Sequence, residues 1–253
     1  MKYIILILFL PIICFSQNAY HFEYDVRLNS LERKAHLNIS KESTSFYYEV
    51  SEKSSSKNKK SENDGNYEIQ VVLGSNKKKE RYQIYEQKKD TILNIDYLND
   101  DIIYYYDKLP TQNWVVTTET KKISKYLCNK AELSFRGRNY IAWFTTDINV
   151  RYGPWKFINT PGLIMQIYDE SKSFFWSINK IETIKQFNEL SINNDSEIIS
   201  LKEFTEKKEK SNLEMVNRSM LRYQERGLEL AKTEINRGRE KTFEWEIEET
   251  KKD

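Results

Sequence analysis

Cysteine, histidine, glycine and proline are all scarce in this chain. Its 253 residues include two cysteines, two histidines, seven glycines and four prolines. One cysteine, Cys14, lies in the leader segment described below, so Cys128 is left alone and no disulfide can form within the rest of the chain. We expect Cys128 to be a small buried apolar side chain, with an intermolecular or reactive thiol as the alternative.

The shortage of histidine and glycine excludes several kinds of site. His21 and His36 lie in expected strands without a neighbouring cysteine or acidic motif, so a zinc site or a histidine-activated nucleophile lacks its residues. Gly137, Gly153 and Gly162 do not approach the spacing of a phosphate-binding loop. We therefore expect no metal, no cofactor and no catalytic residue that can be assigned from the sequence.

The chain also lacks an excess of charge of either sign. The chain has 40 lysines and arginines against 38 aspartates and glutamates, a formal net charge of +2. A nucleic-acid-binding domain or a protein that binds an anionic membrane normally has a clear basic excess. We therefore expect neither as a partner.

The first sixteen residues have the pattern of a signal peptide. Lys2 precedes an apolar run at 3–13, and Cys14-Phe15-Ser16 forms a small-x-small cleavage site. The run is interrupted by Pro11 and is shorter than the roughly 20 residues of a spanning helix, so we expect export without a membrane span. A lipidated Cys14 is the alternative, although Ile13 stands where a lipoprotein signal has a small residue.

Period-two alternation predicts antiparallel strands over most of residues 17–190. Phe22, Tyr24 and Val26 alternate with Glu23, Asp25 and Arg27, which places one face in a core and the other in water. Enrichment in aromatic and β-branched residues supports the other strands. The predicted strands cover 22–28, 35–39, 46–50, 67–73, 82–84, 92–97, 102–106, 114–116, 122–128, 133–145 (a hairpin turning at Gly137), 162–168 and 173–181.

Short connections join nearly all of these strands, and 51–66 reads as a solvated loop because 54–60 has no apolar side chain. The pattern fits a mainly β fold (α+β): a curved antiparallel meander sheet or half-barrel with a C-terminal helical segment.

The period changes near residue 200. Ser200 and Glu203 form a potential capping box, and the charged segment 200–253 carries a narrow apolar stripe. The stripe consists of Leu213, Val216, Met220, Tyr223 and Leu230. We expect a helix that packs along the sheet, with docking on a partner as the alternative; the oligomeric state does not follow from the sequence.

Turn residues and tryptophans are concentrated between residues 123 and 168, and their order resembles a known family. The matching positions are Tyr126, Cys128 and Ala131, then Arg136-Gly137-Arg138, Ala142-Trp143-Phe144-Thr145, Gly153-Pro154-Trp155 and Pro161-Gly162-Leu163-Ile164. This stretch resembles the signature of the GLPGLI family, exported proteins of Gram-negative bacteria without an established activity. Asn159 and Thr160 depart from the opening Gly-Leu of its hexapeptide. The resemblance implies a periplasmic or outer-membrane-associated protein and assigns no catalytic residue.

These observations favour a non-enzymatic module that binds an apolar ligand or an envelope protein on the concave face of the sheet. We place its binding residues in the central stretch: Arg136, Arg138, Trp143, Asp147, Trp155, Pro161 and Gly162. Trp143, Trp155, Trp176, Phe174 and Phe175 have the size to line a pocket or to fill the core. The alternatives are an interaction protein that acts through the helix after Ser200, and a hydrolase that uses Asp147 with Arg136 or Arg138.

Overall fold

The computed structural model describes residues 19–41, 43–49, 81–86, 90–185, 196–225 and 237–250. The expected signal peptide with Cys14, the loop at 51–66 and the strand at 67–73 lie outside these residues. In the described part, no helix is both long and apolar enough to cross a membrane.

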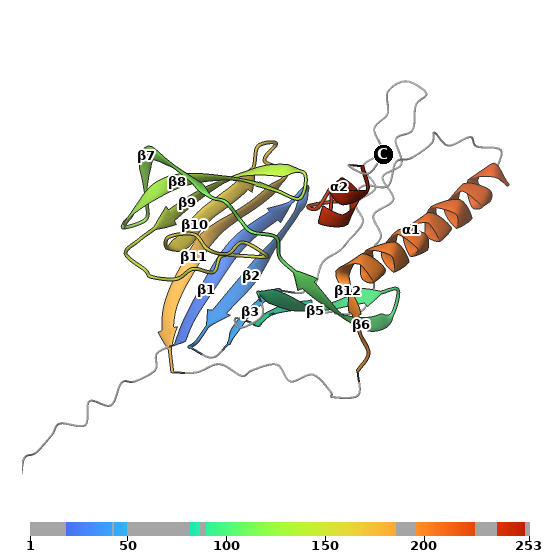
Figure 1. Cartoon of the computed structure of the whole chain (residues 1–253), viewed down its shortest axis with the longest axis horizontal. Coiled ribbons are helices and arrows are strands. Elements are labelled where there is room, and N and C mark those ends of the chain that lie inside the picture. Colours follow the sequence, from blue (N-terminus) through green and yellow to red (C-terminus); the bar gives the residue numbers. More distant parts are fainter. Residues whose placement is uncertain are drawn as a thin grey trace, which may run out of the picture.

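A single curved sheet of twelve strands forms the body of the protein (Figure 1). Its order is β12-β6-β5-β4-β3-β2-β1-β11-β10-β9-β8-β7. The strands are β1 (Ala19–Leu28), β2 (Leu31–Ile39), β3 (Thr44–Tyr48), β4 (Tyr82–Glu86), β5 (Thr91–Leu98), β6 (Asp101–Lys108), β7 (Val115–Ile123), β8 (Tyr126–Phe135), β9 (Arg138–Thr145), β10 (Leu163–Asp169), β11 (Phe174–Ile184) and β12 (Ile198–Ser200). The expected mainly β class, with a C-terminal helical segment, is confirmed.

Alternation along β1 explains why the sheet has a dry inner face. Phe22, Tyr24 and Val26 are buried there, whereas Asp25 and Arg27 point to solvent on the outer face. The Tyr24 hydroxyl donates a hydrogen bond of 2.8 Å to the carbonyl of Ile164, which ties β1 to β10 across the inner face.

The sheet is two consecutive meanders rather than one. The strands β1 to β6 and β7 to β11 each pair with their predecessors, and β1 joins the two sets by antiparallel pairing with β11. The connection at 109–114 therefore runs from β6, next to one edge, to β7 at the other edge. The short strand β12 adds a parallel pair to β6. Pairing between strands this distant in sequence has no local signal.

The inner face is filled by the loop 146–162, called here the inner loop. Trp155 and Phe157 from this loop are almost fully buried, and the Trp155 ring lies nearly parallel to Trp176 at 6.1 Å between centroids. The connection at 109–114 holds the inner loop in place: Gln112 Nε2 donates to the Lys156 carbonyl at 2.7 Å, and the Ile158 amide donates to Gln112 Oε1 at 2.9 Å.

The helix α1 (Leu201–Gln224) begins as its sequence predicts. The Glu203 amide donates to Ser200 Oγ at 3.1 Å, which satisfies one free amide of the first turn. The Phe204 ring stacks on Tyr105 of β6 at 4.0 Å, so the start of the helix packs on the sheet. Further along, the predicted stripe is only partly covered: Leu213 is 50% exposed, and Val216 and Met220 are half-buried. Leu230 and the Tyr223 side chain lie outside the described part of the chain. A second helix, α2 (Glu244–Thr250), follows.

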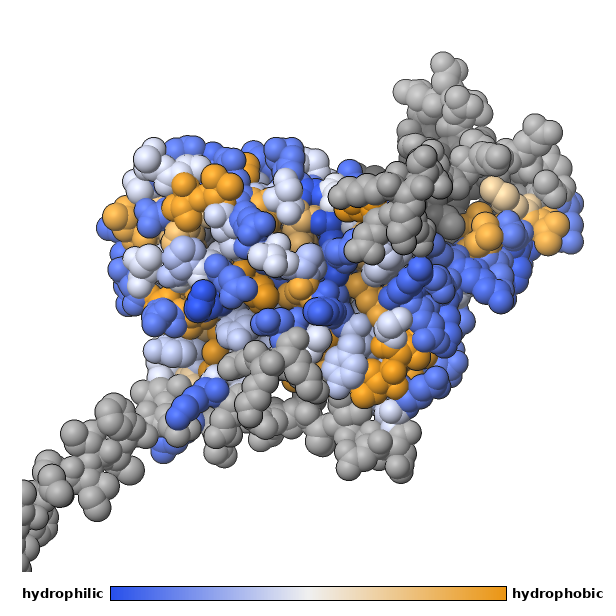
Figure 2. Space-filling view, in the orientation of Figure 1, coloured by the Kyte–Doolittle hydropathy of each residue, from blue (hydrophilic) through white to orange (hydrophobic). Residues whose placement is uncertain are grey.

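The surface is a mosaic of hydrophilic and hydrophobic residues. On the face in Figure 2, hydrophobic residues gather where β6, β12 and the start of α1 meet. Ile102 and Ile198, which belong to these two strands, are exposed.

The expected burial of Cys128 is confirmed, and this burial raises the pKa of its thiol.

Gly162 is required by close packing of two backbone segments. A Cβ at this position would lie 2.0 Å from the Thr145 carbonyl oxygen. We expect Gly162→Ala to lower the free energy of unfolding by about 3 kcal/mol or more, because backbone cannot move aside as a side chain can. Urea denaturation of the full chain would measure this loss.

The matched control is Gly238→Ala, where an added Cβ would meet nothing within 4 Å but φ is +72°. Its expected cost is about 1–2 kcal/mol, the conformational cost of a left-handed residue. Equal losses in the two variants would show that contact with Thr145 is not the reason for Gly162.

Candidate functional site

A tight turn between β8 and β9 fixes the centre of the candidate site. Arg136 (φ 45°) and Gly137 (φ 77°) both adopt positive φ, the pattern of a type I′ hairpin. The Arg136 carbonyl accepts the Lys241 amide at 2.9 Å. A Cβ at residue 137 would lie 2.9 Å from Thr242 Oγ1, so a glycine also allows the C-terminal segment to approach. The prediction of a hairpin turning at Gly137 is confirmed.

The Arg136 side chain is the hub of a buried ion-pair network. Its guanidinium binds Asp107 of β6 with two hydrogen bonds of 2.8 and 2.9 Å. The same guanidinium contacts Glu240 and Glu244 of the C-terminal segment. Lys156 of the inner loop joins the network through Asp107 (2.5 Å) and Glu240 (2.7 Å). Three segments far apart in sequence therefore meet at one turn.

The network keeps its members ionised. Burial by itself would raise the pKa of Asp107, but the charges of Lys156 and Arg136 outweigh burial and lower it to about 2. Glu240 behaves in the same way, because the two cations lower its pKa against the effect of burial. Although burial disfavours the charge of Arg136, the bonds to Asp107 and the nearby glutamates raise its pKa. Carboxylates held in this state are poor proton donors.

Arg138 also holds the C-terminal segment. The predicted contact of Asp147 with Arg136 or Arg138 is not formed. Arg138 binds Asp169 at 3.1 Å, and it donates to the Gly238 carbonyl at 2.6 and 3.1 Å. Asp147 is exposed, and its amide donates to Thr145 Oγ1. The hypothesised pairing of Asp147 with Arg136 or Arg138 is therefore wrong, because both arginines are engaged by other oxygens.

The aromatic residues suggested for one pocket are divided between the two faces of the sheet. Trp155, Trp176 and Phe174 lie on the inner face, where Trp155 and Trp176 stack. Trp143 lies on the outer face, with Lys121 Nζ 4.2 Å from its ring centroid. Phe175 is also on the outer face, under Arg27. Strand alternation separates them, and the inner-face residues Trp155 and Phe174 lie near the C-terminal segment, with the Arg138 guanidinium 4.6 Å from the Phe174 ring.

Pro161 and Gly162 close the inner loop and line neither of the two hollows described below. Pro161 is exposed, whereas Gly162 is buried against Thr145. The Thr160 hydroxyl donates to the Gly162 carbonyl at 2.8 Å, which fixes the exit of the loop.

A cleft of about 300 Å³ lies beside the network, bounded by the inner face, α1 and residues 237–243. Its walls combine aromatic rings with long polar side chains: Tyr48, Tyr105, Trp155, Phe204, Arg81, Gln83, Asn94, Asp96, Lys208, Arg237 and Arg239 among them. In the part of the chain that the structure describes, no group of three or more histidine, cysteine, aspartate or glutamate residues is arranged to hold a metal ion.

Most residues of the cleft were missed by sequence reasoning. Gln83 and Asn94 left one usable signal, because both are polar side chains at inward positions of β4 and β5. Arg239 gave none, since its position over Tyr48 depends on how the C-terminal segment crosses the sheet.

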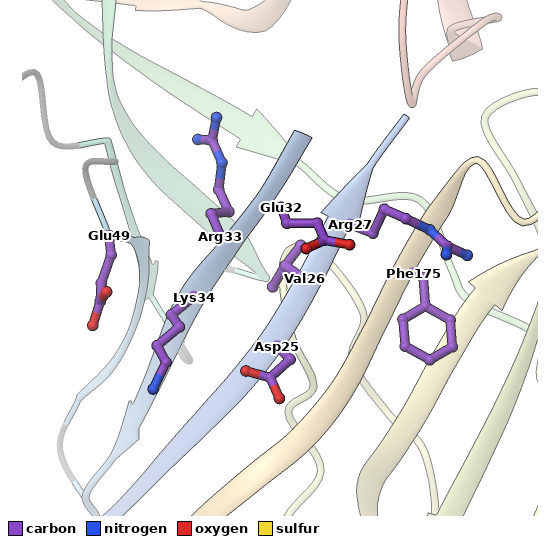
Figure 3. A pocket seen from close by; sticks show the side chains of 8 residues that line it. All are labelled: Asp25, Val26, Arg27, Glu32, Arg33, Lys34, Glu49 and Phe175. Atoms are coloured by element: carbon purple, nitrogen blue, oxygen red, sulfur yellow. The ribbon is translucent and has the colours of Figure 1, made fainter. Parts of the chain in front are cut away.

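A larger hollow of about 620 Å³ lies on the outer face of β1, β2 and β11 (Figure 3). Lys34 lies there between Asp25 and Glu49, whereas Arg27 extends away from Glu32 over Phe175 and Arg33 extends away from Lys34. Charges of both signs are interspersed on a shallow open surface, so this hollow offers no convergent set of groups.

Replacement of Arg136 should make the protein easier to unfold. We expect Arg136→Met to lower the free energy of unfolding by about 3–5 kcal/mol, because Asp107 is left buried and part of its pairing is lost. Chemical denaturation measures the change. Arg151→Met, an exposed position on the inner loop, should stay within about 0.5 kcal/mol of the parent. A similar loss in both variants would contradict the role assigned to Arg136.

The low pKa of Asp107 predicts the acid limb of stability. A carboxyl whose folded pKa is lowered stabilises the fold above its ordinary pKa, near 4, and this contribution is lost as pH falls through the folded value of about 2. We expect Asp107→Asn to flatten the fall in unfolding free energy between about pH 4 and pH 2. Asp147→Asn at an exposed position should keep the parent slope, and an unchanged slope in Asp107→Asn would contradict the assignment.

The fold is similar to solved structures of PNGF-II. Chains in the C2 and P21 space groups superpose with TM-scores of 0.52 and 0.54, at 20% and 18% identity, over 77% of this chain. This chain spans about a third of the length of those chains, 33% and 34%. No curated protein matches the sequence significantly.

A family model described as "N-glycanase peptide, N-terminal domain" matches residues 74–208, more than half of the chain. The match contains the whole stretch 123–168, so the assignment to the GLPGLI family was wrong. The short motifs behind it supply turns and packing contacts, as at Gly137 and Gly162, and do not identify a family. The expectation of a non-enzymatic binding module is overturned by the same match, which relates the chain to a domain of a glycan-processing enzyme, while the expected envelope location stays a prediction. The chain belongs to the family of N-glycanase N-terminal domains.

Proposed function

We propose that this chain works in the hydrolysis of asparagine-linked glycans, as the domain that holds the glycan of the substrate in the cleft beside α1. Family membership supports the reaction class. The observation that carries the binding role is the lining of the cleft, where aromatic rings and planar polar side chains occur together.

Sugars need both kinds of side chain. Their hydroxyl groups donate and accept hydrogen bonds at the edge of the ring, and their C–H groups form an apolar face that packs on aromatic rings. The cleft offers Tyr48 as a ring, and Gln83 and Asn94 as amides. Trp155 supports the wall from behind, because Arg239 and Trp176 cover its ring. Its volume of about 300 Å³ is at the small end of the range for ligand sites, which suits one part of a glycan rather than a whole one.

Gln83 is the residue most suited to contact a hydroxyl group. Its Nε2 donates to Asn94 Oδ1 at 3.0 Å, while its Oε1 is buried without a hydrogen-bond partner. An unpartnered buried acceptor is costly, and a hydroxyl of a bound sugar would satisfy it.

The proposal assigns substrate binding to this domain and bond cleavage to the remainder of an N-glycanase. Asp107 and Glu240 are the buried carboxylates next to the cleft, and both are ionised and bonded to cations. A general acid needs a raised pKa, so these two suit a structural role.

We also propose that the protein is exported. Lys2, the apolar run at 3–13 and the small-x-small site at 14–16 support a signal peptide, which would bring the domain to glycoproteins outside the cytoplasm or in the periplasm.

Replacement of Gln83 tests the binding role. We expect the full chain to bind an N-glycopeptide more tightly than the same peptide without its glycan, measured by isothermal titration calorimetry. Gln83→Leu should weaken glycopeptide binding about fivefold or more, because one polar contact to the sugar is lost. The thermal midpoint should fall only slightly, because the variant removes the unsatisfied Gln83 Oε1 but leaves the buried Asn94 Oδ1 without its donor.

The matched control is Gln166→Leu. Gln166 accepts a 2.6 Å hydrogen bond from Lys121 and so lies on the other face of the sheet. This variant should bind the glycopeptide like the parent. Equal binding of the glycosylated and unglycosylated peptides by the parent chain would overturn the proposed function.

A further inference from the structure

The cleft has more cations than carboxylates, and its carboxylates are already paired. Arg81 binds Asp96, Arg237 binds Glu209, and Lys156 binds Glu240. These pairs account for the three acidic residues of the lining. Arg239 and Lys208 remain, and neither has a carboxylate partner among the residues that the structure describes.

Arg33, which belongs to the lining of the outer hollow, brings a third cation next to the cleft through its contact with Tyr48. Its guanidinium lies 5.5 Å from the centroid of Tyr48, and that of Arg239 lies 5.4 Å from the same ring. Arg239 also lies 4.7 Å from the Trp155 ring and donates to the Tyr48 hydroxyl. Within the described part of the chain, Arg33 Nε is buried and makes no hydrogen bond.

Like charges held this close repel one another. Burial and the neighbouring cations Arg81 and Arg239 lower the pKa of Arg33, which means that its charge is disfavoured where it stands. An anion bound between the cations would relieve that repulsion and would fill the hydrogen-bonding capacity of Arg33. Arginine is the side chain that best matches the planar geometry of a carboxylate or the oxygens of a sulfate.

We infer that the cleft binds an anionic sugar, with its acidic group held by Arg33, Arg239 and Lys208 and a hydroxyl group held by Gln83. This inference rests on the proposed function and narrows its substrate class to glycans that carry a carboxylate or sulfate group. Acceptor and cations occur together only here among the hollows described: the outer hollow of Figure 3 is larger but mixes charges of both signs.

The test compares two glycans that differ only in the charged sialic acids. Probes are a sialylated biantennary N-glycan and the same glycan after removal of its sialic acids, titrated into the full chain at low salt. The acidic glycan should bind about tenfold more tightly, as expected for charge-assisted hydrogen bonds. The preference should shrink at high salt because the cleft is partly open to solvent. A sulfated, desialylated glycan that binds more tightly still would identify sulfate rather than carboxylate as the preferred group.

Variants on the two faces separate this site from general electrostatics. Arg33→Gln and Arg239→Gln should each reduce the preference for the acidic glycan to about threefold or less. Arg33→Gln should leave the thermal midpoint unchanged or higher, because its buried Nε makes no hydrogen bond, whereas Arg239→Gln should lower it, because the bond to the Tyr48 hydroxyl is lost. Arg27→Gln removes an equal charge from the outer face and should keep the full preference.

The outcomes distinguish the two proposals. Equal binding of the acidic and neutral glycans, both tighter than the unglycosylated peptide, would overturn the anionic site and leave the proposed function standing. Binding of neither glycan would overturn both. If Arg27→Gln and Arg239→Gln lost the preference for the acidic glycan equally, the acidic group could not be bound in the cleft.

Discussion

The bond between Arg136 and Asp107 is the constraint on which the arrangement around the cleft depends. Both side chains are almost completely removed from solvent, at 1% and 0% exposure. Charges in such a place are tolerated only when they are paired with good geometry, and here the guanidinium meets the carboxylate with two parallel hydrogen bonds. The pair joins the β8–β9 turn to β6, which stand near opposite edges of the sheet.

The remaining members of the network attach segments that the sheet does not order by itself. Lys156 brings in the inner loop, and Glu240 and Glu244 bring in the C-terminal segment. The positive φ of Arg136 and Gly137 directs the turn toward residues 241 and 242, whose amides bind the Arg136 carbonyl. The cleft exists because the C-terminal segment crosses the inner face and forms one of its walls. Arg138 holds this segment in place through the Gly238 carbonyl.

The chemistry of the cleft follows from an imbalance inside a chain of nearly balanced charge. Each carboxylate in its lining is engaged by a cation, so Arg239 and Lys208, together with Arg33 at its edge, keep their charge available. The proposed site for an acidic glycan depends on this local imbalance, whereas the charge of the whole chain, +2, gives no hint of it.

Local sequence determined the parts of this protein that depend on neighbours in the chain. Alternation marked most of the strands, Ser200 marked the start of α1, and glycine at 137 marked a hairpin turn. The predicted strand at 122–128 was wrong, because residues 124–125 form the turn between β7 and β8, and β12 was not predicted. The tertiary structure alone decided which strands pair across long separations, that Arg136 meets Asp107 rather than Asp147, and that Arg239 lies over Tyr48. The physical reason is that strand propensity and turn geometry act over a few residues, while charge pairing and strand order are set by packing of the whole sheet, which joins positions about a hundred residues apart, such as 136 and 240.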